Sequence, residues 1–388
     1  MSSGCPPGHV PMSFDKIRKT HDTHVASGRI AGYVAAVRIG GRTEVHAGGR
    51  MAIEPDSPPM GEDTLFRIAS VTKPIGGALT LALVEDGVLG LDDPIAGWLP
   101  ELARPRVLVR PDAALDDTVE ANRPLTVRDL LASTAGWGAV MQPTPLQAAT
   151  RERGIYPGPG LVQMTADEFV AQVASLPLAF QPGEGWLYDT SIEVLGVLLA
   201  RATGRSLSDL VAERITGPLG MTSTAFGTRE VDRLATAYAP DEDGGLRVLD
   251  PPDGQFAGPP PFEELSSGLV SSAPDVLRFY CAMADGGAPV IGADSLALMT
   301  ADALTDAHRA MGNPILGPGE SWGLATGVDI AAAQPWQAPG RWGWTGGTGT
   351  TAYVDPVRET VSVLMTQREM TGPQDGPEAF WTAVAEAA

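Results

Sequence analysis

The feature that most constrains this chain is a serine and a lysine three residues apart, Ser70 and Lys73, just before an apolar run that continues to Val84. The run predicts a helix that Asp86-Gly87 ends. If Ser70 caps this helix, Lys73 lies one turn further on, on the same face. A hydroxyl needs a base to become a nucleophile, and a lysine is a base only when its amine is neutral, as burial favours. The spacing therefore predicts a serine nucleophile with a lysine base.

Composition excludes several other kinds of protein. Lys and Arg number 27 against 47 Asp and Glu, a formal net charge of −20, which argues against nucleic acid and anionic membranes as partners. Two cysteines, Cys5 and Cys281, form no disulfide framework and are expected as free thiols, and the five histidines have no metal-ligand spacing. We expect a soluble, cytoplasmic protein without metal or cofactor; its oligomeric state is open.

Strand patterns stand near both ends of the 388-residue chain, and helical patterns fill its middle. Strands are predicted at 33–39, 43–47, 322–330, 350–354 and 360–366. Helices are predicted at 14–27, near 125–131, at 165–175 and 192–203, from 206, from 272, and at 378–387. The segment from 104 to 123 is polar and is expected at the surface. This order favours one sheet assembled from both ends of the chain, with the helical middle inserted.

Two further segments contain candidate site residues. Tyr188 directly precedes a predicted helix in a turn flanked by Pro182-Gly183, where its hydroxyl can point at a neighbouring site and relay a proton. Taken alone, it fits a half-buried packing residue better. The glycine-rich segment 341–350 lets backbone N–H groups approach a substrate closely, as an oxyanion hole requires. An ordinary glycine-rich hairpin explains this segment equally well.

Three segments, taken in chain order, resemble the three motifs of the serine β-lactamase and penicillin-binding superfamily. They are Ser70-x-x-Lys73, Tyr188-x-Thr190 and Trp344-Thr345-Gly346. The resemblance is greatest to class C β-lactamases and the related family VIII carboxylesterases, and it spans nearly the whole chain. It implies an α+β, transpeptidase-like fold. Residues 1–75 and 320–388 would form a sheet domain, 76–319 a mainly helical domain, and the active site would lie at their interface.

The resemblance also implies roles for individual residues. Ser70 would be the acylated nucleophile and Lys73 its base. Tyr188 would relay the proton during acylation and deacylation. The backbone N–H groups of Ser70 and Gly347 would bind the oxyanion.

Two departures from the family pattern bear on the substrate. Trp344 stands where the family usually has a lysine that meets a substrate carboxylate, and Thr190 stands where it has an asparagine. Losing one charge-assisted contact costs about 1.5–3 kcal/mol. Arg341 would point away from Trp344 in a regular strand and so would not replace that lysine. We expect instead an aromatic site for neutral, apolar esters, and the substrate-binding candidates are Trp344, Thr345, Gly346, Trp137 and Trp186. For Trp137 and Trp186, core packing is an equally good interpretation.

Two other segments match motifs of unrelated enzyme classes, and we interpret both matches as chance. Gly319-Glu320-Ser321-Trp322-Gly323 matches a nucleophile elbow, but that fold needs a histidine later in the chain, and none follows His308. Gly347-x-Gly349-x-x-Ala352 matches a relaxed dinucleotide fingerprint, but the residues after it read as a strand rather than a helix.

The sequence therefore predicts a serine carboxylesterase that hydrolyses small ester substrates through an acyl-enzyme on Ser70. A β-lactamase or D-alanyl peptidase is the main alternative, and an acyltransferase would use the same acyl-enzyme. A non-catalytic binding protein is a further alternative, which the joint presence of Ser70, Lys73 and Tyr188 disfavours. The physiological ester and its acyl-chain length are left open.

Overall fold

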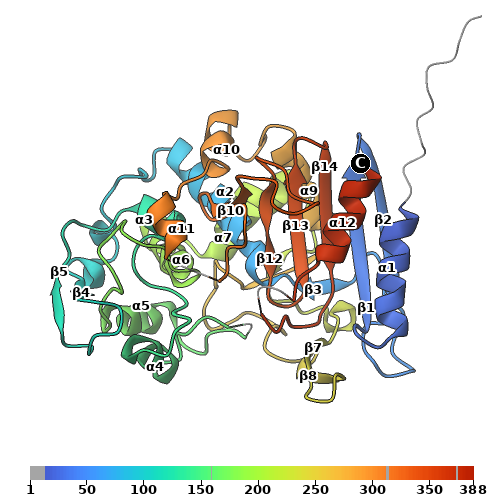
Figure 1. Ribbon diagram of the computed structural model, residues 1–388, viewed down its shortest axis with the longest axis horizontal. Helices are drawn as coiled ribbons and strands as arrows, with labels where there is room; N and C mark the ends of the chain where they lie inside the picture. Colours follow the sequence, from blue (N-terminus) through green and yellow to red (C-terminus); the bar gives the residue numbers. More distant parts are fainter. Residues whose placement is uncertain (1–13, 159, 312–313, 373–374) are drawn as a thin grey trace, which may run out of the picture.

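The computed structural model describes residues 14–158, 160–311, 314–372 and 375–388 (Figure 1). Cys5 lies outside these residues, and Cys281 is a free thiol. Within the described residues, no helix has both the length and the apolar character needed to cross a membrane. The architecture combines a large antiparallel sheet with a helical region beside it, which confirms the predicted α+β, transpeptidase-like fold.

The large sheet joins the two ends of the chain. Its seven strands lie in the order β10-β11-β12-β13-β14-β1-β2, and all neighbours are antiparallel. β1 from the N-terminal part pairs with β14 from the C-terminal part, with Val34 opposite Met365. The strands are β1 (Gly32–Ile39), β2 (Arg42–Gly49), β10 (Glu320–Trp322), β11 (Gly327–Asp329), β12 (Trp342–Gly346), β13 (Thr350–Asp355) and β14 (Thr360–Met365).

Helices cover both faces of this sheet. Along β1, Tyr33 packs with the apolar faces of α1 (Asp15–Ala26) and α12 (Glu378–Ala387), whereas Val34 packs into the main core on the other face. This alternation has the period of two that a strand requires. The second face is covered by α9 (Ala273–Ala284), which contacts β1, β13 and β14. The predicted division of the chain into a sheet domain and a helical domain (residues 76–319) remains a prediction. α9 belongs to the predicted helical domain in sequence but packs on the large sheet.

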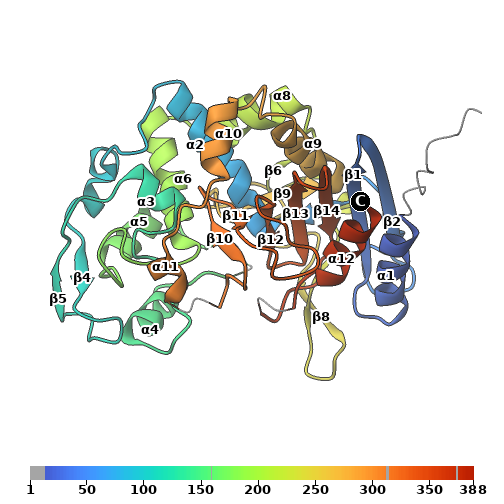
Figure 2. The ribbon, with the colours of Figure 1, turned by 45° about the horizontal axis from the view of Figure 1, so that its top comes forward.

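The helical region is built around α2 (Thr72–Glu85), whose residues 72–83 are all buried. A helix buried on every side belongs in the middle of a core, and α2 runs between α6 and β12 (Figure 2). The other helices are α3 (Val127–Leu131), α4 (Pro145–Glu152), α5 (Ala166–Ala174), α6 (Thr190–Thr203), α7 (Leu207–Val211), α8 (Gly217–Leu219), α10 (Ala293–Met299) and α11 (Asp306–Ala310).

Three small sheets complete the fold. β3 and β6 both pair with β9, and the hairpins β4–β5 and β7–β8 are two-stranded sheets of their own. Their bounds are β3 (Leu65–Arg67), β4 (Arg106–Leu108), β5 (Thr118–Glu120), β6 (Ala225–Phe226), β7 (Ala237–Pro240), β8 (Leu246–Asp250) and β9 (Leu269–Ser272).

Two sequence-based expectations about elements were wrong. The segment 322–330 is not one strand, because a turn at residues 323–326 separates β10 from β11 and Ala325 has a positive φ of 60°. The segment 104–123 is not purely surface, because the β4–β5 hairpin buries Val107 and Leu108 in the main core. In both cases tertiary packing overrides a local pattern.

The turn between β12 and β13 is attached to the chain just before α2. Thr348 Oγ1 donates to the carbonyl of Arg67 at 2.7 Å, and Thr350 Oγ1 donates to the carbonyl of Ile68 at 2.8 Å. Gly346 makes this close approach possible, since a Cβ there would lie 2.5 Å from the Ile68 oxygen. These contacts hold the end of β12 beside the 3₁₀ turn at Ala69–Val71, which carries Ser70.

We predict that Gly346→Ala lowers the free energy of unfolding by about 1–3 kcal/mol, because the added methyl group forces backbone apart. Gly347→Ala is the matched control, since a Cβ at that position meets nothing within 4 Å. Urea denaturation followed by circular dichroism measures both variants. Equal stability of the two would show that the turn is not held by this close approach.

Candidate active site

Ser70 lies in a 3₁₀ turn, Ala69–Val71, between β3 and α2. Ala69 has a positive φ of 45°, an uncommon conformation for a residue with a side chain, which turns the chain sharply before Ser70. The expectation that Ser70 caps the helix was wrong. Val71 is the N-cap residue of α2, and its side chain makes no capping hydrogen bond. The Ser70 side chain is therefore available to the site.

Lys73 lies one turn further on and points at Ser70, as the spacing predicted. Its Nζ is 3.0 Å from Ser70 Oγ, and it also contacts Asp189 Oδ1 at 2.5 Å and the carbonyl of Ser266 at 3.1 Å. Burial by itself lowers the pKa of Lys73, but the Asp189 carboxylate and Tyr188 outweigh it and raise the pKa above its ordinary value. The Asp189 carboxylate thus favours the ammonium form of Lys73, whereas burial alone would favour the neutral amine that the spacing argument expected.

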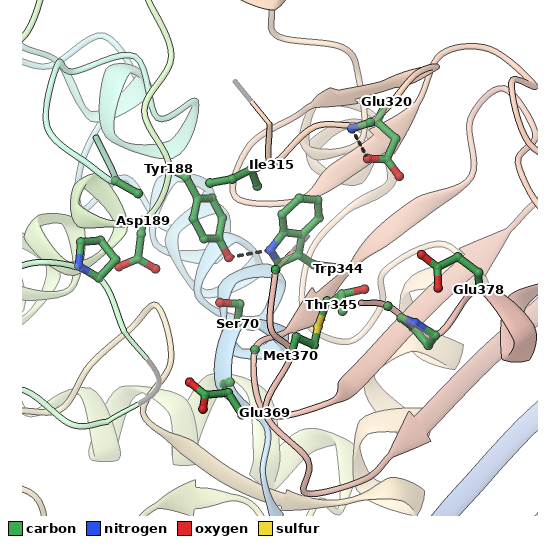
Figure 3. Close-up of a pocket in the computed structure, with 18 of the residues that line it drawn as sticks. Ser70, Tyr188, Asp189, Ile315, Glu320, Trp344, Thr345, Glu369, Met370 and Glu378 are labelled. Atoms are coloured by element: carbon green, nitrogen blue, oxygen red, sulfur yellow. Dashed lines mark hydrogen bonds between the residues drawn. The ribbon is translucent and has the colours of Figure 1, made fainter. Parts of the chain in front are cut away.

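Tyr188 comes from the segment just before α6, and its hydroxyl points toward Ser70 (Figure 3). The Trp344 Nε1–H donates to the Tyr188 hydroxyl at 2.6 Å, and Lys73 Nζ lies 4.4 Å from the centre of the phenol ring. Burial raises the pKa of Tyr188, while the Lys73 charge and the hydrogen bonds with Ser70 and Trp344 act against that rise. Ser70, Lys73 and Tyr188 therefore form one cluster through which a proton can move.

Asp189 is the functional candidate that sequence reasoning missed. Its carboxylate contacts Lys73, and its backbone has φ +89° and ψ −74°. In an extended segment, successive side chains point to opposite sides. The turn at Asp189 instead lets Tyr188 and Asp189 both reach Lys73. An acidic residue next to the motif tyrosine was the available signal, but it did not reveal where the side chain points.

Ser70 opens into a cavity of about 430 Å³. Apolar and aromatic side chains from loops far apart in the sequence form much of its wall. Sequence analysis missed them because their loops carry no motif. They are Met141, Tyr156, Ile315, Trp336, Met370 and Trp381.

The predicted substrate-binding residues divide into two groups. Trp344 and Thr345 line the cavity. Trp137 and Trp186 do not; they are 6% and 1% exposed and pack in the core, so their predicted role in the wall was wrong. Gly346 also lies outside the lining and instead permits the close approach to the nucleophile segment.

The described residues in the wall of the cavity include no cation that could receive a substrate carboxylate. Among the described residues that line it, none is Lys, Arg or His, whereas Glu320, Glu369 and Glu378 are present (Figure 3). Arg341 does not reach the cavity, because its guanidinium pairs with Asp329 and lies over the Tyr353 ring.

The predicted oxyanion donors are the backbone N–H groups of Ser70 and Gly347. Both residues line the cavity. The Gly347 carbonyl accepts a hydrogen bond from the N–H of Met370 at 2.8 Å, which helps to hold the turn after β12. Binding of an oxyanion by these two N–H groups remains a prediction.

The two motifs judged coincidental do not form sites in the structure. Ser321 is fully buried on β10, where its hydroxyl donates to Asp302 and accepts from Arg309, so it has no access to a substrate. The segment after Gly349 is the strand β13, not the helix that a dinucleotide fingerprint requires.

Comparisons with known proteins identify the family of the chain. The Beta-lactamase family model matches residues 17–387. Esterase EstB of Burkholderia gladioli is 33% identical over 367 residues, which cover 90% of this chain and 88% of EstB. Protein Rv1367c of Mycobacterium tuberculosis is 37% identical over 325 residues, covering 80% of this chain and 79% of that protein.

Solved structures show the same fold. EstCE1, described as a hydrolase with promiscuous acyltransferase activity, superimposes with a TM-score of 0.82 and 26% identity over 96% of this chain and 97% of that one. The simvastatin synthase LovD of Aspergillus terreus, as its LovD6 mutant, has a TM-score of 0.79 and 23% identity over 98% and 99% of the two chains. The chain belongs to the β-lactamase family and is an enzyme of its serine-hydrolase type.

Proposed function

We propose that this chain is a serine carboxylesterase that hydrolyses small apolar esters through an acyl-enzyme on Ser70. The observation that carries the proposal is the position of Ser70 Oγ, within 3.0 Å of Lys73 Nζ and at the wall of a largely apolar cavity. The similarity to esterase EstB and to the hydrolase EstCE1 supports the same conclusion.

In this mechanism the proton of Ser70 passes to the Lys73–Tyr188 pair as Oγ attacks the ester carbonyl carbon. The same proton then passes to the departing alkoxide, and the acyl group stays on Ser70. Water repeats the sequence to release the acid. An alcohol or amine in place of water would give acyl transfer, an alternative favoured by the acyltransferase activity described for EstCE1.

The cavity wall favours a neutral ester over a β-lactam or a D-alanyl peptide. Those substrates carry a carboxylate, and a charge-assisted contact to it contributes about 1.5–3 kcal/mol. Trp344 carries no positive charge, and the charged side chains among the described lining residues are all acidic. A carboxylate in this cavity would lie among like charges, which disfavours its binding.

Trp344 takes a different part in the reaction. Its indole N–H donates to the Tyr188 oxygen, the atom on which negative charge develops when the phenol gives up its proton. A donor in this position stabilises the phenolate. Trp344 therefore assists proton transfer rather than recognition of an anion.

The first prediction concerns the nucleophile. The wild type should hydrolyse short-chain p-nitrophenyl esters much faster than a chromogenic cephalosporin, and Ser70→Ala should lose at least about 10³-fold in kcat. A phosphonate probe should add covalently to Ser70, as mass spectrometry would detect. Dominant cephalosporin cleavage would favour a β-lactamase. No turnover together with no adduct would favour a binding protein.

The second prediction concerns Trp344→Phe, which keeps an aromatic ring but removes the donor. We expect kcat/KM for p-nitrophenyl esters to fall about 10- to 100-fold, the value of a hydrogen bond to a charged group. Since the bond lowers the pKa of Tyr188, its loss should move the acid limb of the pH–rate profile to higher pH.

Trp186→Phe is the matched control, because Trp186 packs in the same aromatic cluster but its buried N–H has no partner among the described residues. This variant should keep the acid limb of the wild type. Equal effects of the two substitutions would contradict a specific role for the Trp344 donor.

A further inference from the structure

The wall of the active-site cavity contains acidic side chains that no described cation neutralises. Glu320, Glu369 and Glu378 line the cavity, and each is partly exposed. None of these three forms an ion pair with a residue that the structure describes, whereas Asp189, the other acidic residue of the wall, pairs with Lys73. A cleft lined by charges of one sign attracts ligands of the opposite sign. The wall therefore favours a ligand that brings positive charge.

Two of these carboxyl groups act on each other. Glu320 lies on β10 and Glu378 in the first turn of α12, and Figure 3 shows both on the side of Trp344 away from Tyr188. Burial raises the pKa of Glu320, and the negative charge of Glu378 adds to the rise, so the two groups are close enough to repel each other. An ammonium group beside both would offset this repulsion.

Two aromatic rings in the wall give a second, independent reason to expect a cation. Trp336 and Trp381 both line the cavity, with their ring centres 5.8 Å apart. The face of an indole ring attracts a cation, above all where water is displaced. Trp381 lies three residues after Glu378 in α12, so the ring and the carboxyl group share one face of the helix.

Arg341, the arginine beside this part of the wall, does not supply the cation. It lowers the pKa of Glu320 and lies 5.0 Å from the centre of the Trp381 ring, but it pairs with Asp329 and does not line the cavity. A ligand that enters the cavity therefore meets the carboxyl groups and not the guanidinium.

The expected cation is part of a substrate rather than a metal ion. In the described parts of the chain, no group of three or more His, Cys, Asp or Glu side chains is arranged to hold a metal. Acidic side chains alone would not identify a ligand site. Ser70 does, because a nucleophile in the wall acts only on a substrate that enters this same cavity.

We propose that the preferred substrates are esters with an organic ammonium group away from the reacting carbonyl, which Glu320, Glu378 and the Trp336–Trp381 pair receive. The proposal rests on the proposed esterase function and narrows its substrate class. Neutral apolar esters are also substrates, because much of the wall is apolar, but they leave both carboxyl groups unpaired. The ammonium group takes no part in the reaction on Ser70 and keeps its charge throughout.

The test compares esters that differ only in charge. Acetylcholine and 3,3-dimethylbutyl acetate have the same shape, with a positive nitrogen in the first where the second has a carbon. The longer pair, 6-(trimethylammonio)hexyl acetate and 7,7-dimethyloctyl acetate, places the charge further from the carbonyl. With the wild-type chain, titration of the released acetic acid should give a kcat/KM about 5- to 30-fold higher for the cationic member of at least one pair. Equal or lower values for the cationic member of both pairs would overturn the proposal.

Substitutions locate the charge that is recognised. Glu320→Gln and Glu378→Gln each remove one negative charge at nearly constant size, so each should lower the cationic-to-neutral ratio of kcat/KM about 3- to 10-fold. The change should appear in KM for the cationic ester rather than in kcat, because the contact is remote from the reacting carbonyl. Glu184→Gln is the matched control, since Glu184 is exposed and lies outside the wall, and it should keep the wild-type ratio.

The possible failures are distinguishable. An unchanged ratio in both cavity variants would contradict recognition by these carboxyl groups. Should either variant fail to fold, the two ester pairs with the wild-type chain still decide between a cationic and a neutral preference. Absence of turnover of all four esters and of p-nitrophenyl acetate would instead refute the proposed esterase function.

Discussion

The site depends on one buried charge. An ammonium at a fully enclosed position is costly unless a fixed anion and further acceptors compensate it. Lys73 has such compensation from Asp189, Ser266 and Ser70, and the parts of the fold that supply it come from three separate segments. The strained turn before α6 and the Glu193 contact that holds Ser266 are both understandable as means of keeping these acceptors around Lys73.

Trp344 brings no positive charge to the site but donates a hydrogen bond to Tyr188. The motif resemblance places Trp344 where the family pattern has a lysine that meets a substrate anion, and tryptophan carries no charge. Its indole donates to Tyr188 at 2.6 Å and packs edge-on against Trp322, within the same aromatic cluster as Trp186. On the proposed function, Trp344 supports proton transfer rather than recognition of a charged group.

Much of this structure could be predicted from local signals. The spacing of Ser70 and Lys73 follows from helical geometry, and the position of strands at both ends of the chain correctly indicated a single sheet. What failed depends on contacts distant in sequence. Trp137 and Trp186 are next to motif residues in the chain but face the core, and the direction of Asp189 is set by a turn whose positive φ no composition rule predicts. The apolar cavity wall was missed because it is assembled from loops without periodicity.

The pairing of β1 with β14 has a consequence for how the chain is made. β1 is synthesised long before β14, so the edge of β1 that pairs with β14 has no partner until β14 has been made. Contacts this distant in sequence form slowly, and an unpaired strand edge is open to association with other chains in the meantime. The nascent polypeptide also carries Ser70 long before Trp344 and the turn after β12 exist. A nascent chain that ends before β12 therefore holds an incomplete catalytic centre.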